Sequence, residues 1–386
     1  MKTVTAARLD FRGLTAAVVL GTLGALTIMI VPGFVMLVGA QSNLDDRQLG
    51  FIASWDINAT AIAIGVSTFL IARLNWRHLA LAGLLLIVIG NVLTAGGHTY
   101  PSIMAARICA GVGEGLAIAV SFAALGSAAN PDRAFGVYLI VGLTVSAAVL
   151  VSLPLLQGRF GAATVFYGMA ALTLTSTALL RWLPRANTGR SGRLDGTADV
   201  SKHLAVAGLV GVFLYFIAQG AVWSYFERIG AASGVNAVTI GEAMGLSSFA
   251  GMGGALVAVA MVTRCGRVWP LVTSGAISIS SFCMLHGHVT GVQLITAGIL
   301  FNFGWNLAQP LLSGVCSDAD CRGRVVVAMG CIQTVGFGIG PALAAVILRG
   351  HDFAPSLWMS AAIVVVSLVI VIAGLKFQTR LLPATV

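Results

Sequence analysis

The stretch Arg107-Ile-Cys-Ala-Gly-Val-Gly-Glu114-Gly carries the most information about the fold, because it places two charged residues inside an apolar run. Seven residues separate Arg107 from Glu114. At about 100° per residue, both side chains lie on one helical face, roughly 10 Å apart along the axis. A charge at membrane depth costs at least ~2.5–3.5 kcal/mol and usually faces a protein interior or a cavity. The stretch therefore predicts a membrane-spanning helix with a functional polar face.

The composition extends this prediction to the whole chain. Hydrophobic residues make up 58% of the 386 and charged residues only 9%, whereas a soluble domain carries about 25% charged residues. We therefore expect an all-α integral membrane protein. Apolar stretches of about 20 residues, the length that crosses a bilayer, predict twelve transmembrane helices, near 13–40, 49–72, 78–96, 102–128, 134–157, 161–183, 204–229, 239–262, 269–287, 290–316, 325–348 and 354–375.

A polar, glycine-rich segment divides these helices into two groups of six. We expect a six-helix bundle over 1–185, a cytoplasmic linker over 186–203 and a second six-helix bundle over 204–386. With both termini in the cytoplasm, the only basic residues left outside the cell are Arg47, Arg159, Arg228 and Arg349, and Arg107 lies within the membrane. This excess of cytoplasmic positive charge supports the helix count and this topology. We expect the protein to lie in the inner (cytoplasmic) membrane.

The two halves contain matching segments at matching positions. Ala72-Arg73-Leu-Asn75-Trp-Arg77 follows the second predicted helix, and Thr263-Arg264-Cys-Gly266-Arg267 follows the eighth. Short acidic and basic turns likewise follow the fourth and tenth. Repeated six-helix units with a site between them are a transporter architecture, so the two bundles are expected to be pseudo-symmetric.

On these motifs the chain resembles the major facilitator superfamily. The two basic loops resemble that family's signature loop, although Ala72 and Thr263 stand where an aspartate is usual. Arg107, followed by Gly111 and Gly113, resembles the fourth-helix motif of proton-coupled members. The resemblance implies a role for this arginine in proton transfer.

The resemblance is uneven over the rest of the chain. The fifth-helix glycine–proline motif of drug/proton antiporters is absent, since Ser152-Leu-Pro154 has no flanking glycines. Tyr225-Phe-Glu227-Arg228-Ile-Gly230 looks like bacterial efflux-type permeases of the family. The resemblance therefore favours export only slightly.

Three charged residues are candidates for proton coupling. Asp56 lies in the second predicted helix at a depth similar to that of Arg107, with Glu114 about two turns deeper. An arginine between two carboxylates lets one pair with it while the other takes a proton. The alternative is a static structural ion pair.

Polar residues of the seventh and tenth predicted helices are candidates for substrate binding. Spacings of three and four residues place them on helical faces, and they suit an uncharged or aromatic solute. Interfacial aromatics, interhelical hydrogen bonds and, for Glu227-Arg228, a solvated end pair are the alternatives. The candidates are Gln219, Trp223, Asn302, Trp305, Asn306 and Gln309.

Other residue patterns exclude several classes of function. Thr239-Ile-Gly-Glu242 has the form of a capping box that opens a helix, which explains this glutamate without a ligand. The sequence has no nucleotide-binding loop and no metal-ligand spacing. Its basic residues are too dispersed for nucleic acid. We expect no cofactor, no metal and no enzymatic activity.

The sequence thus predicts a secondary active transporter that moves a small organic solute by alternating access, coupled to protons. Its partners would be that solute, protons and the lipid bilayer, and it would act as a monomer. An uncoupled facilitator is the first alternative, with the buried charges serving structure and gating. A membrane sensor that binds a ligand without moving it is the second.

Overall fold

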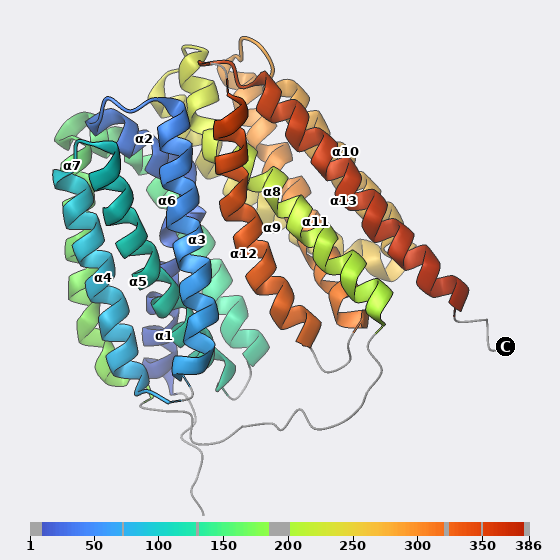
Figure 1. The fold of residues 1–386 in the computed structure, drawn as a ribbon, viewed down its shortest axis with the longest axis horizontal. Coiled ribbons are helices and arrows are strands. Elements are labelled where there is room, and N and C mark those ends of the chain that lie inside the picture. Colours follow the sequence, from blue (N-terminus) through green and yellow to red (C-terminus); the bar gives the residue numbers. More distant parts are fainter. Residues whose placement is uncertain are drawn as a thin grey trace, which may run out of the picture. The chain divides into compact units, whose positions relative to one another are not determined.

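The computed structural model describes residues 10–71, 73–128, 131–184, 201–319, 324–348 and 350–381. Within these ranges the chain is helical, as the sequence predicts (Figure 1). Most of the predicted linker 186–203 lies outside the described residues. The helices belong to two compact units. The first comprises Met1–Leu44, Trp55–Val149 and Leu155–Arg193, and the second Asp45–Ser54, Leu150–Pro154 and Leu194–Val386.

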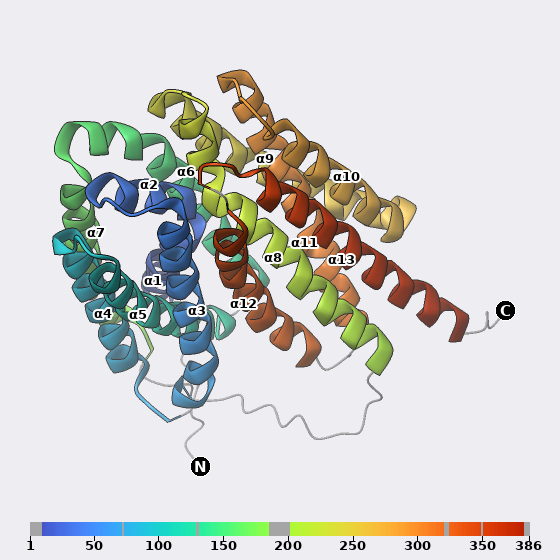
Figure 2. The same cartoon turned by 45° about the horizontal axis from the view of Figure 1, so that its top comes forward.

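The first unit is built around α5. Its α1 and α4 pack directly on α5, while α7 packs on α4. Figure 2 shows α4 and α5 side by side. The helices that contribute to this unit are α1 (Phe11–Met29), α2 (Val31–Gln41), α3 (Asp46–Ile71), α4 (Trp76–Gly96), α5 (Tyr100–Gly126), α6 (Pro131–Phe160), α7 (Ala162–Ser176) and the short 3-10 helix η1 (Thr177–Trp182).

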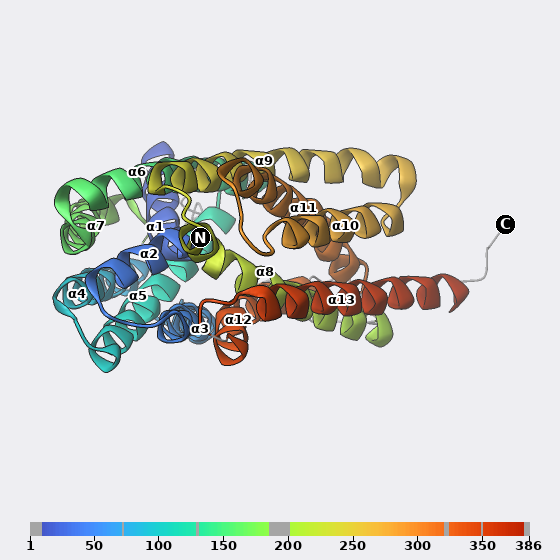
Figure 3. The same ribbon diagram turned by 90° about the horizontal axis from the view of Figure 1, so that it is seen from above.

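The second unit is built around α8 and α11. Helix α8 packs on α11, α12 and α13, and α11 also packs on α9 and α10. Figure 3 shows α8 running beside α13. Its own helices are α8 (Lys202–Ala232), α9 (Ala237–Cys265), α10 (Val268–Met284), α11 (Gly291–Ala319), α12 (Arg324–Ile347) and α13 (Ala354–Leu381). The first turns of α3 and a short part of α6 also belong to it.

The first predicted stretch, 13–40, is two helices rather than one. Helix α1 ends at Met29, Ile30 leaves the helical region at φ −108° and ψ 22°, and α2 begins at Val31. Pro32 explains the break, because proline has no N–H to donate and favours the first turn of a new helix. Each other predicted stretch overlaps one described helix, except that 161–183 covers both α7 and η1.

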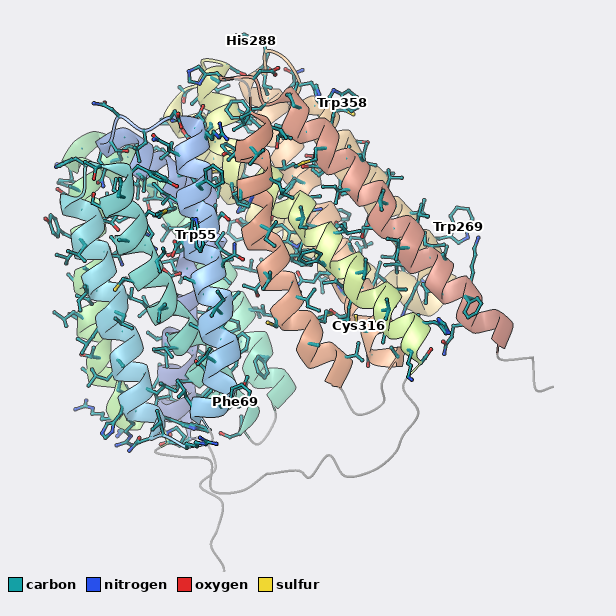
Figure 4. The ribbon with its side chains drawn as sticks, in the orientation of Figure 1. Trp55, Phe69, Trp269, His288, Cys316 and Trp358 are labelled. Atoms are coloured by element: carbon teal, nitrogen blue, oxygen red, sulfur yellow. The ribbon has the colours of Figure 1, made fainter. Side chains whose placement is uncertain are left out.

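Nine of the described helices are long and apolar enough to cross a membrane, judged by length and composition. Large aromatic side chains lie on the outer surface of the second unit. Trp269 on α10 is 69% exposed and Trp358 on α13 is 59% exposed, and both project away from their helices in Figure 4. Exposed tryptophans of this kind are typical of helices in contact with lipid.

Glycines on α5 bring the neighbouring helices close to it. A Cβ atom at Gly111 would lie 2.3 Å from the Asp56 carbonyl oxygen of α3, and one at Gly113 would lie 2.5 Å from the Gly83 carbonyl oxygen of α4. Both contacts are with backbone, which has no free rotation to move aside. The glycine-rich segment is therefore a close-packing surface, and it sets the distance between Asp56 and the α5 side chains.

The predicted capping box at Thr239 is wrong, because α9 begins earlier, at Ala237. Asn236 is the N-cap, and its side-chain oxygen accepts from the Thr239 backbone N–H at 2.9 Å. Asparagine is among the preferred N-cap residues, and the N3 N–H is the donor it typically satisfies. Glu242 is exposed on the first turns of this helix.

Candidate functional site

Arg107 lies at the centre of a buried ionic network in the first unit. Its guanidinium bonds Asp56 Oδ2 through Nη2 at 2.8 Å and Nε at 3.2 Å, and Glu114 Oε1 through Nη2 at 3.0 Å. The exposed fraction of each of the three residues is 1%. The structure therefore brings together the three residues that the sequence selected for proton coupling, and Arg107 is shared between two carboxylates.

Three further residues complete the shell around the guanidinium. Asn91 on α4 accepts from Arg107 Nη1 at 2.9 Å, and the Thr27 hydroxyl of α1 accepts from Nη2 at 3.4 Å. The Phe34 ring of α2 lies 4.7 Å from the guanidinium carbon, a cation–π distance. Sequence reasoning missed all three, since single neutral polar residues and phenylalanines are common in membrane helices. The break before α2 that positions Phe34 was signalled only by Pro32.

Glu114 is held by two hydroxyls as well as by the arginine. Thr27 donates to its Oε1 at 2.6 Å, and Thr60 of α3 donates to its Oε2 at 3.3 Å. Asp56 differs, because its Oδ1 is buried and has no hydrogen-bond partner among the described residues. The two carboxylates are therefore not equivalent: Glu114 has both oxygens bonded, and Asp56 has one oxygen free to take a proton or a new donor.

A small cavity adjoins the network on the Glu114 side. Its volume is about 20 Å³, and Thr27, Asn91 and Glu114 line it together with Met169 and Thr173 of α7. A polar cavity of this size holds about one water molecule. Water at this position would have the hydroxyl, amide and carboxylate groups as hydrogen-bond partners.

The charges in this network are unequal in number. One guanidinium faces two carboxylates, so the fully ionised cluster carries a net charge of −1 at a depth where an unpaired charge is costly. Protonation of one carboxyl makes the cluster neutral while the other stays paired with Arg107. The arrangement can therefore hold one proton and exchange its place between the two acids.

Two of the predicted substrate residues lie together in the second unit. Gln219 on α8 is completely buried, and neither atom of its amide has a hydrogen-bond partner within the described ranges; the Tyr215 hydroxyl lies near it without hydrogen-bond geometry. One turn later, the Trp223 ring stacks on Phe301 of α11, with centroids 5.5 Å apart and planes 8° apart.

The predicted stripe on α11 divides between two surroundings. Asn302 donates to the Ser247 hydroxyl of α9 at 3.0 Å, and Asn306 donates to the Asn302 carbonyl oxygen at 2.9 Å. Asn302 therefore forms the interhelical hydrogen bond that the sequence left open as its alternative. Trp305 contacts Phe216 of α8 and Phe337 of α12 instead, and its indole N–H is buried with no partner in the described part of the chain. Gln309 is half-buried.

The solvated end pair that the sequence left open as the alternative for Glu227 and Arg228 does not form. Arg228 bonds Asp46 Oδ1 through Nε at 2.6 Å and Nη2 at 2.5 Å, while His351 Nδ1 lies 2.9 Å from the other Asp46 oxygen. Adjacent residues on a helix point about 100° apart, so the two side chains diverge. Glu227 is buried, with an exposed fraction of 5%.

The two loops that resemble the family signature both use an arginine to tie helix ends together. In the first unit, Arg77 donates through Nε to the Leu183 carbonyl oxygen at 2.7 Å. In the second, Arg267 pairs with Asp318 at the end of α11. The second loop thus contains an acidic–basic contact, with its carboxylate supplied by α11 rather than by the loop position occupied by Thr263.

The fold and site define an all-helical, multi-pass membrane protein with a buried ion network in one of its two units. The sequence model of the Major Facilitator Superfamily matches residues 15–319. The chain belongs to this superfamily, and it is a transporter rather than an enzyme.

Solved transporters share the fold at low sequence identity. The nucleoside transporter NupG is 14% identical, with a TM-score of 0.75 over 94% of this chain and 99% of that one. A D-xylose-proton symporter is 15% identical, with a TM-score of 0.74 over 94% and 97%. The xylose transporter XylE from E. coli, partially occluded and inward open, is 14% identical, with a TM-score of 0.71 over 97% and 99%. A comparison with curated protein sequences finds no match.

Proposed function

We propose that this chain is a secondary active transporter that moves a small organic solute by alternating access and couples that movement to protons. The observation that carries the proposal is the single guanidinium of Arg107 shared between Asp56 and Glu114, all three buried. Ionisable groups inside a membrane are costly and typically belong to functional sites such as proton relays, which supports this role.

The coupling step follows from the inequality of the two acids. Glu114 borders the small cavity, whereas Asp56 is not among the residues that line it, so a proton brought by water reaches the Glu114 carboxyl first. Protonated Glu114 no longer attracts Arg107 as an anion, and the guanidinium is then held by Asp56 alone. Loss of the proton restores the shared state, and this alternation changes the contacts between α3 and α5.

The proposal includes the membrane arrangement and the solute site. We place the chain in the cytoplasmic membrane as a monomer, with twelve spans in two six-helix bundles and both termini in the cytoplasm. Gln219, Trp223 and Trp305 form the centre of the solute site, and Asn302, Asn306 and Gln309 border it. The motif resemblance favours export, while two of the structural neighbours bear the names of a nucleoside transporter and a proton symporter.

Reconstitution of the purified full-length protein tests the proposal. Proteoliposomes are tested for flux of uridine, D-xylose and tyramine, with and without an imposed pH gradient. We expect one solute to move against its own gradient when the pH gradient is present. If the protein is an uncoupled facilitator, the net flux of every transported solute stops when its concentrations on the two sides are equal, whatever the pH gradient. That result would refute the proton coupling.

A further inference from the structure

Glu227 is a buried acid that the ionic network in the first unit does not use. Its Oε2 has no hydrogen-bond partner, and it forms no ion pair among the residues that the structure describes. Arg228, the cation next to it in the chain, is committed to Asp46 at 2.5 Å. The carboxylate of Glu227 therefore has no ion-pair partner of its own, and Arg228 attracts it only from beyond ion-pair distance, in a region where an unpaired charge is costly.

Further unpartnered polar atoms lie on the same side of α8. At about 100° per residue, Gln219, Trp223 and Glu227 spread over an arc of roughly 80°, and Ser224 lies about 60° beyond. The hydroxyl of Ser224 and both amide atoms of Gln219 are buried without partners within the described ranges. Eight residues separate Gln219 from Glu227, so the polar groups form a track about 12 Å long.

Aromatic rings of α8 itself and of the neighbouring α11 lie along this track. Trp223 lies between its two polar ends and stacks on Phe301 of α11. Trp305, also on α11, packs against Phe216 of α8 with centroids 5.9 Å apart, and its buried N–H has no partner in the described part of the chain. Aromatic faces attract organic cations and stack on flat rings. In this conformation the rings pack on one another, so a ligand would take the place of ring–ring contacts.

We infer that the α8 track binds an organic ammonium with an aromatic body. The ammonium group donates to Glu227 and Ser224, the ring stacks against Trp223, and a neutral hydrogen-bonding group at the far end meets Gln219 and the Trp305 N–H. This inference rests on the proposed transport function and names the class of its solute. A neutral solute would leave Glu227 uncompensated, an anion would be repelled by it, and a bare proton would not use the aromatic walls.

Tyramine and tyrosol test this inference, because they share a phenol and differ in one end group, an ammonium or a hydroxyl. Binding is measured by calorimetry on the purified protein in detergent. We expect tyramine to bind more tightly than tyrosol. We expect Glu227→Gln to weaken the binding of tyramine about tenfold or more, the size typical for loss of a bond to a charged group. The affinity for tyrosol should stay within about twofold of its original value. Glu242→Gln, the same change at the exposed acid of α9, should alter neither affinity.

The outcomes separate this inference from the proposed function. Equal binding of tyramine and tyrosol by the unchanged protein overturns the ammonium site, even if proteoliposomes transport another solute. Equal weakening of both ligands by Glu227→Gln also overturns it, since the acid would then act only on structure. Ser224→Ala is a second variant with little risk to folding. It should weaken the binding of tyramine and leave the binding of tyrosol unchanged. Selective tyramine binding without tyramine transport would support the binding site and refute the proposal that this class of solute is transported.

Discussion

The buried cluster of Arg107, Asp56 and Glu114 illustrates what residue-level sequence reasoning can and cannot supply. Charges in apolar helices are rare, so their spacing and predicted depth were enough to select these three residues as one candidate site. Thr27, Asn91 and Thr60, which bond the same groups, could not be selected, since hydroxyls and amides in membrane helices usually satisfy local backbone or neighbouring helices.

Loss of Arg107 should cost more stability than loss of either acid. Arg107→Gln leaves two buried carboxylates without their cation, and breaking a buried pair from one side typically costs about 3–5 kcal/mol. Asp56→Asn leaves the arginine paired with Glu114 and should cost less. Thermal unfolding in detergent gives both values. If Arg107→Gln melted at or above the temperature of Asp56→Asn, the network would not have the shared charge described for it.

At the scale of elements, helix existence was predictable and helix breaks were not. Apolar length identified the helical segments, because a bilayer sets that length. The break at Ile30 and the start of α9 at Asn236 depend on local donors and acceptors, and apolar length does not report these. The division of the α11 stripe between α9 and the aromatic rings depends on packing partners, which spacing along one helix cannot reveal.

The α3–α5 contact gives a test at this scale with a matched control. Gly111→Ala places a methyl group 2.3 Å from the Asp56 carbonyl oxygen, so backbone must move; overpacking of this kind costs about 1–3 kcal/mol. Gly65→Ala, within α3, meets nothing within 4 Å and should be neutral or stabilising. Melting temperatures in detergent compare the two. Equal melting temperatures for both variants would show that α3 and α5 do not pack as closely as described.

At the scale of the whole molecule, the sequence predicted the family correctly, and the superfamily match over 15–319 confirms it. The domain boundaries at 185 and 204 remain a prediction. The compact units are discontinuous, since 45–54 and 150–154 belong to the second. Asp46 shows one reason: its carboxylate bonds Arg228, and its carbonyl oxygen accepts from Tyr225 at 2.9 Å. Contacts between distant segments of this kind cannot be read from the order of helices.

The central claim is that movement of the solute is coupled to a proton held by the cluster at Arg107, and Glu114 provides the most direct test of it. Proteoliposomes containing an internal pH-sensitive dye report proton flux when a transported solute is added, and exchange of labelled for unlabelled solute reports binding and movement without net proton flux. For Glu114→Gln, which keeps the shape of the side chain but cannot exchange a proton, we predict that exchange persists and the pH signal disappears. A pH signal in this variant equal to that of the unchanged protein would contradict the account.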